Sequence, residues 1–331
     1  TACLPPSSVC DFNTLVTSTQ VNTDDGLSCS CATSVEETAC GTSNARCSED
    51  GGAHCEALTA APRGWIAYLS GTPGSTSQRI KLIRADGSDA RNVVAMTGDK
   101  SSLAWTADGS GLIVVMNDGS GYHVYHVDLL AGTPPTVIDG CEEAGTPFAA
   151  VPVVGSTDLI LTLFDAAAND LGLRLLDTTT RTCSSFIDDD TLNESAPGTL
   201  LCGPDVVVSY VASNHRGSGF EARLAPLLSP ADGFSLDLPS FIGTPTVSPT
   251  CDVACYGDAP GANPRVNCGP LDHGVLVSGS PVPGSDADDS PQFLVDGSSL
   301  VVTHVYTEGS LINPEVTLLD PTTGARTRLT N

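Results

Sequence analysis

The chain has 331 residues and a formal net charge of −25, from 39 acidic and 14 basic residues. Nucleic acids and anionic membrane surfaces would repel such a chain, so both are excluded as partners. The length exceeds that of an ordinary domain with a single core, which is about 100–200 residues. Together with 33 Gly, 23 Pro and short Val, Ile and Leu runs, it favours a repeated β-architecture over helices.

The first predicted element is a small disulfide-stapled module over residues 1–61. This stretch is rich in cysteine and poor in large apolar side chains, so we expect crosslinks rather than a core to hold it. We expect a disulfide from Cys3 to another cysteine of the module. Thr1, Ala2 and Cys3 also resemble the end of a bacterial lipoprotein cleavage site, and a lipid anchor at Cys3 is the alternative. The cysteines of the module are Cys3, Cys10, Cys29, Cys31, Cys40, Cys47 and Cys55.

All thirteen cysteines together indicate the compartment. Their spacings are irregular and include no Cys-x-x-Cys pair, which favours structural disulfides in an extracellular, cell-surface or periplasmic protein over a metal or haem site. The pairing stays open, and an odd total leaves one thiol free, lipidated or joined to another chain. No apolar run is long enough to cross a bilayer, so no transmembrane segment is expected. The other six cysteines are Cys141, Cys183, Cys202, Cys251, Cys255 and Cys268.

A repeat of roughly 45 residues is predicted over residues 62–331. Its unit is a strand that ends at an aspartate, and degenerate copies are expected over residues 220–225 and 271–277. A second signal is an aromatic residue before an Asp-Gly turn and a buried strand, at 103–109 and 291–297. Asp-Gly suits a tight hairpin because glycine adopts positive φ without strain. The clear copies of the first unit are residues 79–87, 122–128, 173–177 and 314–320.

These residues resemble the Asp-Gly repeats of the TolB-like β-propeller family. The resemblance implies an all-β propeller of about six four-stranded blades, and it is weakest over residues 243–268, which we interpret as a blade with a disulfide-pinned insertion. A β-sandwich and a seven-bladed ring are the alternatives. The family also supplies the propeller of prolyl-oligopeptidase-type enzymes. No Gly-x-Ser-x-Gly motif is present, and the predicted propeller over residues 62–331 leaves too few residues for a hydrolase domain. The resemblance therefore extends to the propeller alone.

Candidate site residues are few, and no catalytic residue is predicted. Two acidic clusters offer hard oxygen ligands of the kind that Ca²⁺ prefers, with solvated turns as the alternative. Asn193 begins an Asn-Glu-Ser glycosylation sequon. His123 and His126 are three apart in a predicted strand, so they face opposite sides of the sheet and cannot share a metal. The acidic residues are Asp188, Asp189, Asp190, Asp286, Asp288 and Asp289.

The function that these features favour is binding rather than catalysis. We expect a secreted or surface-anchored bacterial propeller that acts as a protein-binding scaffold, as the resemblance to TolB-like propellers implies. The alternative is self-association, as a structural subunit of an extracellular filament or surface assembly, which the odd cysteine would suit. A third hypothesis is a glycan-active enzyme, which requires two acids about 5–9.5 Å apart.

Overall fold

The computed structural model describes residues 64–71, 75–88, 90–93, 96–129, 133–187, 189, 191–202, 205–214, 220–236, 238, 242–258, 264–272, 275–276, 279–294, 296–308 and 311–330. Before residue 64, it describes the backbone of five strands, and a few other strand residues are likewise described by their backbone alone. Those five are β1 (Ser7–Asp11), β2 (Thr14–Asp24), β3 (Cys29–Ala39), β4 (Ala45–Ser48) and β5 (His54–Ala57). Strands β1, β2 and β3 form one antiparallel sheet and β4 pairs with β5. The predicted boundary between residues 61 and 62 lies outside the described residues.

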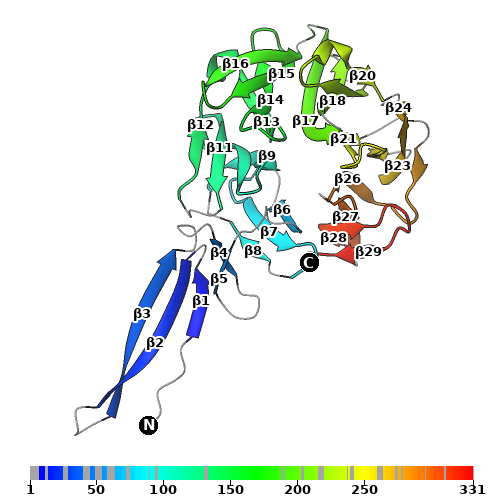
Figure 1. Ribbon diagram of the computed structural model, residues 1–331. Helices are drawn as coiled ribbons and strands as arrows, with labels where there is room; N and C mark the ends of the chain where they lie inside the picture. The colour runs from blue at the N-terminus through cyan, green and yellow to red at the C-terminus, as the bar shows by residue number, and fades with distance from the viewer. Residues whose placement is uncertain are drawn as a thin grey trace.

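Six antiparallel sheets follow, and Figure 1 shows them arranged as blades around a common centre. Blade 1 contains β6 (Trp65–Ser70), β7 (Arg79–Arg84) and β8 (Arg91–Asn92). Blade 2 contains β9 (Asp99–Trp105), β10 (Gly111–Asn117), β11 (Tyr122–Asp128) and β12 (Thr136–Ile138). Blade 3 contains β13 (Thr146–Pro152), β14 (Leu159–Asp165), β15 (Asp170–Asp177) and β16 (Thr182–Ile187).

The second half of the ring repeats this arrangement. Blade 4 contains β17 (Leu192–Cys202), β18 (Asp205–Asn214), β19 (Glu221–Pro226) and β20 (Phe234–Ser235). Blade 5 contains β21 (Ile242–Val247), β22 (Val253–Asp258), β23 (Arg265–Asp272), β24 (Val275–Leu276) and β25 (Ser280–Pro281). Blade 6 contains β26 (Asp288–Phe293), β27 (Leu300–Glu308), β28 (Leu311–Leu319) and β29 (Arg326–Arg328). Two short 3₁₀ helices are η2 (Glu142–Ala144) and η3 (Pro230–Asp232).

The core of this ring lies between consecutive blades rather than in one central mass. The second strands β10 and β14 are buried almost end to end, because a neighbouring blade covers each face. One cluster joins blades 2 and 3 and includes Ile113, Val115 and Leu161. The cluster of Ile66, Ile83 and Leu329 joins blade 6 to blade 1 and closes the ring. Closure therefore depends on apolar contacts between the two ends of the repeat array.

The Asp-Gly turns have the expected conformation. Asp108 Oδ1 accepts hydrogen bonds from the backbone N–H of Ser110 at 3.0 Å and from its hydroxyl at 2.8 Å, and Gly109 has φ +71°. Asp296 Oδ1 makes the same two bonds to Ser298, at 3.0 Å and 2.7 Å. The aspartate recurs because its carboxylate satisfies a turn N–H, and the glycine recurs because it adopts positive φ.

The predicted repeat is confirmed in number and corrected in detail. Its unit is the third strand in blades 2, 3, 4 and 6, and in blade 1 it is β7, the second of the three described strands. The degenerate copy at 220–225 is β19. The copy expected at 271–277 is displaced, because the third strand of blade 5 is β23, Arg265–Asp272. Within the described residues blade 1 has three strands and blade 5 has five, where four were expected. The β-sandwich and the seven-bladed ring are both wrong.

Candidate binding groove between the second and third blades

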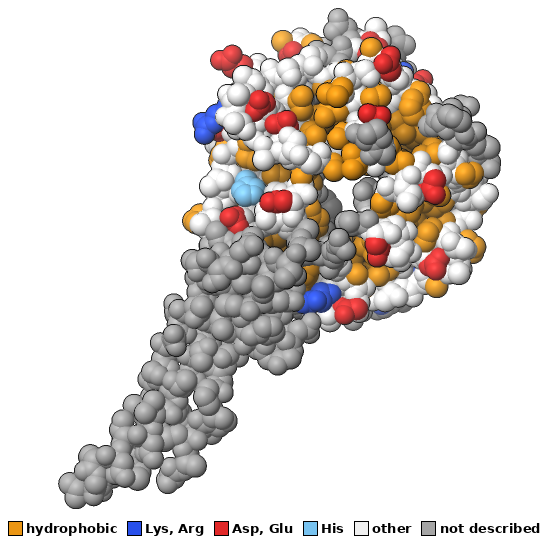
Figure 2. Space-filling model, viewed as in Figure 1, with side chains coloured by type: hydrophobic (Ala, Val, Ile, Leu, Met, Phe, Trp, Pro, Cys, Tyr) orange, Lys and Arg blue, Asp and Glu red, His pale blue; other side chains and the backbone are white. Residues whose placement is uncertain are grey.

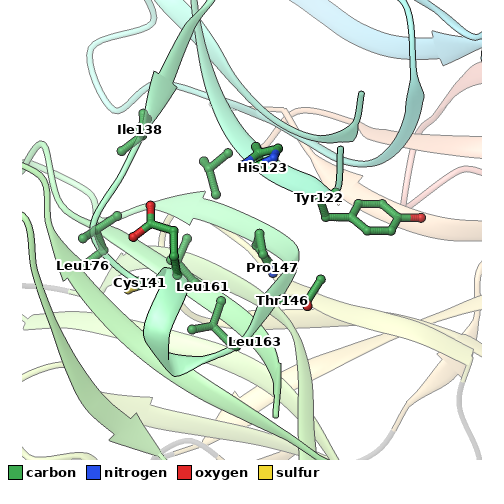
Figure 3. Close-up of a pocket in the computed structure, with 13 residues that line it drawn as sticks. Tyr122, His123, Ile138, Cys141, Thr146, Pro147, Leu161, Leu163 and Leu176 are labelled. Carbon is green, nitrogen blue, oxygen red and sulfur yellow. The ribbon is translucent and has the colours of Figure 1, made fainter. Parts of the chain in front are cut away.

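A hollow of about 290 Å³ lies where blade 2 meets blade 3 (Figure 3). Its inner wall consists of apolar side chains from β11, β12, β14 and β15, including Leu161, Leu163 and Leu176. Its opening is bordered by Tyr122 and His123 from the start of β11 and by Thr146 and Pro147 from the start of β13. We call this hollow the interblade groove.

The segment that connects β12 to β13 forms one side of the groove, and the sequence fixes its path. Gly140 and Gly145 have φ of +136° and +143°, and a Cβ at Gly145 would lie 2.6 Å from the carbonyl oxygen of Phe164. The Cys141–Cys183 disulfide attaches the segment to β16, the outer strand of blade 3. Glu142 accepts a hydrogen bond from the backbone N–H of Gly140 at 2.9 Å. The groove therefore has a fixed wall.

Three aromatic rings continue the apolar surface at the edge of the groove. The ring of Phe148, 40% exposed, stacks on that of Tyr122 with centroids 5.6 Å apart. The ring of Phe164 meets Phe148 edge to face at 6.1 Å. Because Tyr122 borders the groove and also contacts Phe148, the aromatic patch and the groove form one surface.

The polar groups beside the groove are held by hydrogen bonds. The Tyr122 hydroxyl donates to Asp99 Oδ2 at 3.1 Å, and burial followed by this carboxylate raises the pKa of Tyr122. On the opposite face of β11, toward blade 1, the Tyr125 hydroxyl donates to Asp118 Oδ2 at 2.8 Å. Burial, followed by Asp118, raises the pKa of Tyr125 to about 12. The Ser120 hydroxyl lowers the pKa of Asp118 more than any other neighbour does. Phenols with raised pKa values stay protonated at neutral pH, so these tyrosines are hydrogen-bond donors rather than bases.

All six cysteines after residue 62 form disulfides, as expected. Cys141 pairs with Cys183, and Cys202 at the end of β17 pairs with Cys251 of blade 5, so this second bond joins blades 4 and 5. Cys255 pairs with Cys268 directly across β22 and β23 of blade 5. The range 243–268, for which the sequence predicts an insertion, consists mostly of the strands β21, β22 and β23. The side chains of the seven N-terminal cysteines, Cys3 to Cys55, lie outside the described residues.

The acidic clusters are only partly described. Asp189 Oδ1 accepts hydrogen bonds from the N–H and hydroxyl of Thr191, at 2.9 Å and 2.6 Å, as a turn residue does. Asp188, Asp190 and the side chain of Asp289 lie outside the described residues. Among the residues that the structure describes, no group of three His, Cys, Asp or Glu side chains is placed to hold a metal ion. Calcium binding stays a prediction.

Asp286 and Asp288 have opposite environments. Asp286 is exposed, whereas the carboxylate of Asp288 is fully buried in blade 6. Its Oδ1 lies 2.6 Å from His304 Nδ1, and its Oδ2 accepts a hydrogen bond from Arg326 at 2.5 Å. Burial raises the pKa of Asp288 and outweighs these two partners, which lower it. This carboxylate therefore has a structural partner on each oxygen.

Asn193 lies in β17, and its Oδ1 accepts a hydrogen bond from the backbone N–H of Leu171 at 3.1 Å. The side chain is half-buried and connects β17 with β15 of the preceding blade. Glycosylation of Asn193 stays a prediction.

The fold is that of a six-bladed β-propeller. No protein-family model and no curated protein matches the sequence. Among solved structures, the chain resembles TolB from Acinetobacter baumannii, with a TM-score of 0.59 and 16% identity over 98% of this chain and 79% of that one. It also resembles a putative TolB from Agrobacterium tumefaciens, with a TM-score of 0.59 and 14% identity over 76% and 87% of the two chains.

A third similar structure is a chain of a nidogen/laminin complex, with a TM-score of 0.54 and 13% identity over 81% of this chain and 94% of that one. At these identities, the comparisons establish the propeller fold. In the described part of the chain, no helix has the length and apolar character needed to cross a membrane.

Proposed function

We propose that this chain is an exported, non-catalytic propeller whose rigid ring binds another protein. The observation that carries the proposal is the continuous apolar surface formed by the interblade groove and the exposed ring of Phe148. Exposed aromatic patches on soluble proteins commonly mark binding sites, and Tyr and Phe are enriched in protein interfaces. The wall of the groove is held by a disulfide, so binding needs little ordering of the site.

The hydrogen bonds of the described polar groups favour binding over catalysis. The Tyr122 hydroxyl beside the groove donates to Asp99, and in blade 6 the buried Asp288 is held by His304 and Arg326. A general acid or base must be within reach of a substrate, and these groups are already engaged with one another. A solved propeller chain from the nidogen/laminin complex shows that the fold occurs in a protein assembly.

Export is supported by the three disulfides of the ring. Such bonds persist in oxidising compartments, including the periplasm and the cell exterior, and are rare in a reducing cytosol. The structural resemblance to two TolB propellers accords with the same proposal.

Self-association is the second candidate function, and the odd number of cysteines favours it. The six cysteines of the ring pair with one another, so the odd cysteine of the thirteen falls among the seven at Cys3 to Cys55. An intermolecular disulfide or a lipid anchor at Cys3 would use it. The intact mass of the native protein, with and without reduction, separates a disulfide-linked oligomer, an acylated chain and a monomer.

The protein-binding proposal is tested by zero-length carbodiimide coupling in the native source, which joins carboxylates of this chain to amines of a partner. The chemistry suits a chain with 39 acidic residues and only two lysines, Lys81 and Lys100. A coupled protein is then purified and titrated against the pure chain by calorimetry. Saturable binding in the micromolar range or tighter supports the proposal. Failure of every coupled protein to bind in pure form overturns it.

A further inference from the structure

The interblade groove has the size of a site for side chains rather than for a whole cofactor. Its volume of about 290 Å³ is at the lower limit of small-molecule pockets, which measure about 300–1,000 Å³. The apolar wall of Leu161, Leu163 and Leu176 offers no charged partner at depth, so the group that enters is apolar. Tyr122 and Pro147 lie at its rim, so a bound segment would continue past these two residues (Figure 3).

The surroundings of the groove are acidic. Glu142 and Glu143 lie on η2, and both are exposed. Asp139 precedes them, and Asp99 accepts the hydrogen bond of Tyr122. Arg181 is a cationic neighbour among the described residues, and it lies 3.9 Å from Asp139 with both side chains exposed. Figure 2 shows acidic side chains distributed over the visible face of the ring, which agrees with the net charge of −25.

We propose that the interblade groove and the Phe148 patch bind an extended segment of another protein that presents a bulky apolar side chain between lysines or arginines. The apolar side chain enters the groove against Leu161 and Leu163. The flanking cations face Glu142, Glu143 and Asp139, and the aliphatic part of one of them covers the ring of Phe148. This inference rests on the proposed protein-binding function and adds the site and the chemistry of the partner.

Charge complementarity selects this occupant over others. A second copy of the chain carries the same large negative charge, so association of two copies at this acidic rim would be opposed. An acidic or phosphorylated segment would meet the same repulsion. A neutral apolar segment would make the apolar contacts in the groove but no ionic contacts with the acidic residues at its rim.

The test uses the purified full-length chain with its disulfides intact and three short fluorescein-labelled peptides. One has a central phenylalanine between lysines, one has glutamates in place of the lysines, and one has serine in place of the phenylalanine. Anisotropy is measured at low and at high sodium chloride. We expect only the first peptide to saturate the chain, and its binding to weaken with salt, because exposed charges are screened.

Two variants and two matched controls locate the site. Phe148→Ala should weaken the first peptide about tenfold, as loss of an interface aromatic does. Phe220→Ala, at a phenylalanine that is 53% exposed and directly precedes β19 of blade 4, should leave binding unchanged. Glu143→Gln should weaken it roughly two- to threefold. Its control, Asp232→Asn, changes the one acid of η3. Circular dichroism confirms that each variant is folded.

The outcomes separate this inference from the proposed function. Lack of binding by the first peptide, equal binding of the glutamate peptide, or equal losses from Phe148→Ala and Phe220→Ala overturns the groove as the site. A natural partner that binds the Phe148→Ala chain as tightly as the unaltered chain refutes the groove and leaves protein binding intact. If the groove behaves as expected and no coupled protein binds in pure form, the proposed function fails instead.

Discussion

The disulfide between blades 4 and 5 should contribute much of the stability of the ring. Cys202 and Cys251 are 49 positions apart, about one blade of the repeat. Closing a loop of that length in the unfolded chain removes conformational entropy equivalent to about 4 kcal/mol at 25 °C. The double variant Cys202→Ser/Cys251→Ser should therefore unfold with a free energy lower by about that amount.

Guanidinium chloride unfolding, followed by far-ultraviolet circular dichroism, measures the loss in the free energy of unfolding. That loss is the shift of the unfolding midpoint multiplied by the slope of the free energy against denaturant concentration. The Cys141→Ser/Cys183→Ser variant is the matched control, because its disulfide spans 42 positions and predicts nearly the same loss. A loss below about 1 kcal/mol for the Cys202/Cys251 pair at unchanged slope would refute the reasoning. The apolar cluster between blades 4 and 5, which includes Leu224 and Tyr256, would then be sufficient to hold them.

Three further predictions follow from single groups. Lys100 is buried, and its Nζ donates to the backbone carbonyls of Gln78, Met96 and Gly98 at 2.8–2.9 Å. Lys100→Met removes these hydrogen bonds, so it should lower the free energy of unfolding by at least about 2 kcal/mol. A loss under about 0.5 kcal/mol, measured by denaturant unfolding, would contradict this. Asp118 has a pKa lowered by Ser120, so its stabilisation is present above about pH 4 and is lost as the pH falls. The unfolding midpoint of the unaltered chain should thus drop more between about pH 5 and pH 3 than that of Asp118→Ala, and equal drops would argue against it. Alkylation of the unfolded, unreduced protein should label none of the six cysteines in the ring. A labelled Cys141 or Cys268 would show that the pairing is wrong.

The sequence could predict the fold because the propeller repeats locally. Asp-Gly-Ser at 108–110 and 296–298 makes the same turn twice with its own side chains, so the turn needs no distant partner. The copy at 271–277 is displaced because the third strand of blade 5, β23, begins at Arg265 and already ends at Asp272. Its aspartate is therefore the last residue of the strand rather than the second residue of the predicted unit.

The candidate groove could not be predicted in the same way. Tyr122, Phe148 and Phe164 belong to three strands of two blades, and their spacing follows no motif. Their contacts depend on the packing of β11 against β13 and β14, which is a property of the assembled ring. Likewise, the sequence predicts Asp288 as a candidate Ca²⁺ ligand in an acidic cluster, with a solvated turn as the alternative, and only the structure reveals its burial against His304 and Arg326.

By itself, the sequence determined the class of fold, the number of blades and the oxidising compartment that its cysteines suit. These properties depend on local turn chemistry and on composition, which a linear chain displays directly. The tertiary structure alone decided which cysteines pair, which carboxylates are buried and which aromatic rings meet at the interblade groove. Those properties depend on distances between residues from different strands and blades, and ring closure by Ile66, Ile83 and Leu329 sets such distances.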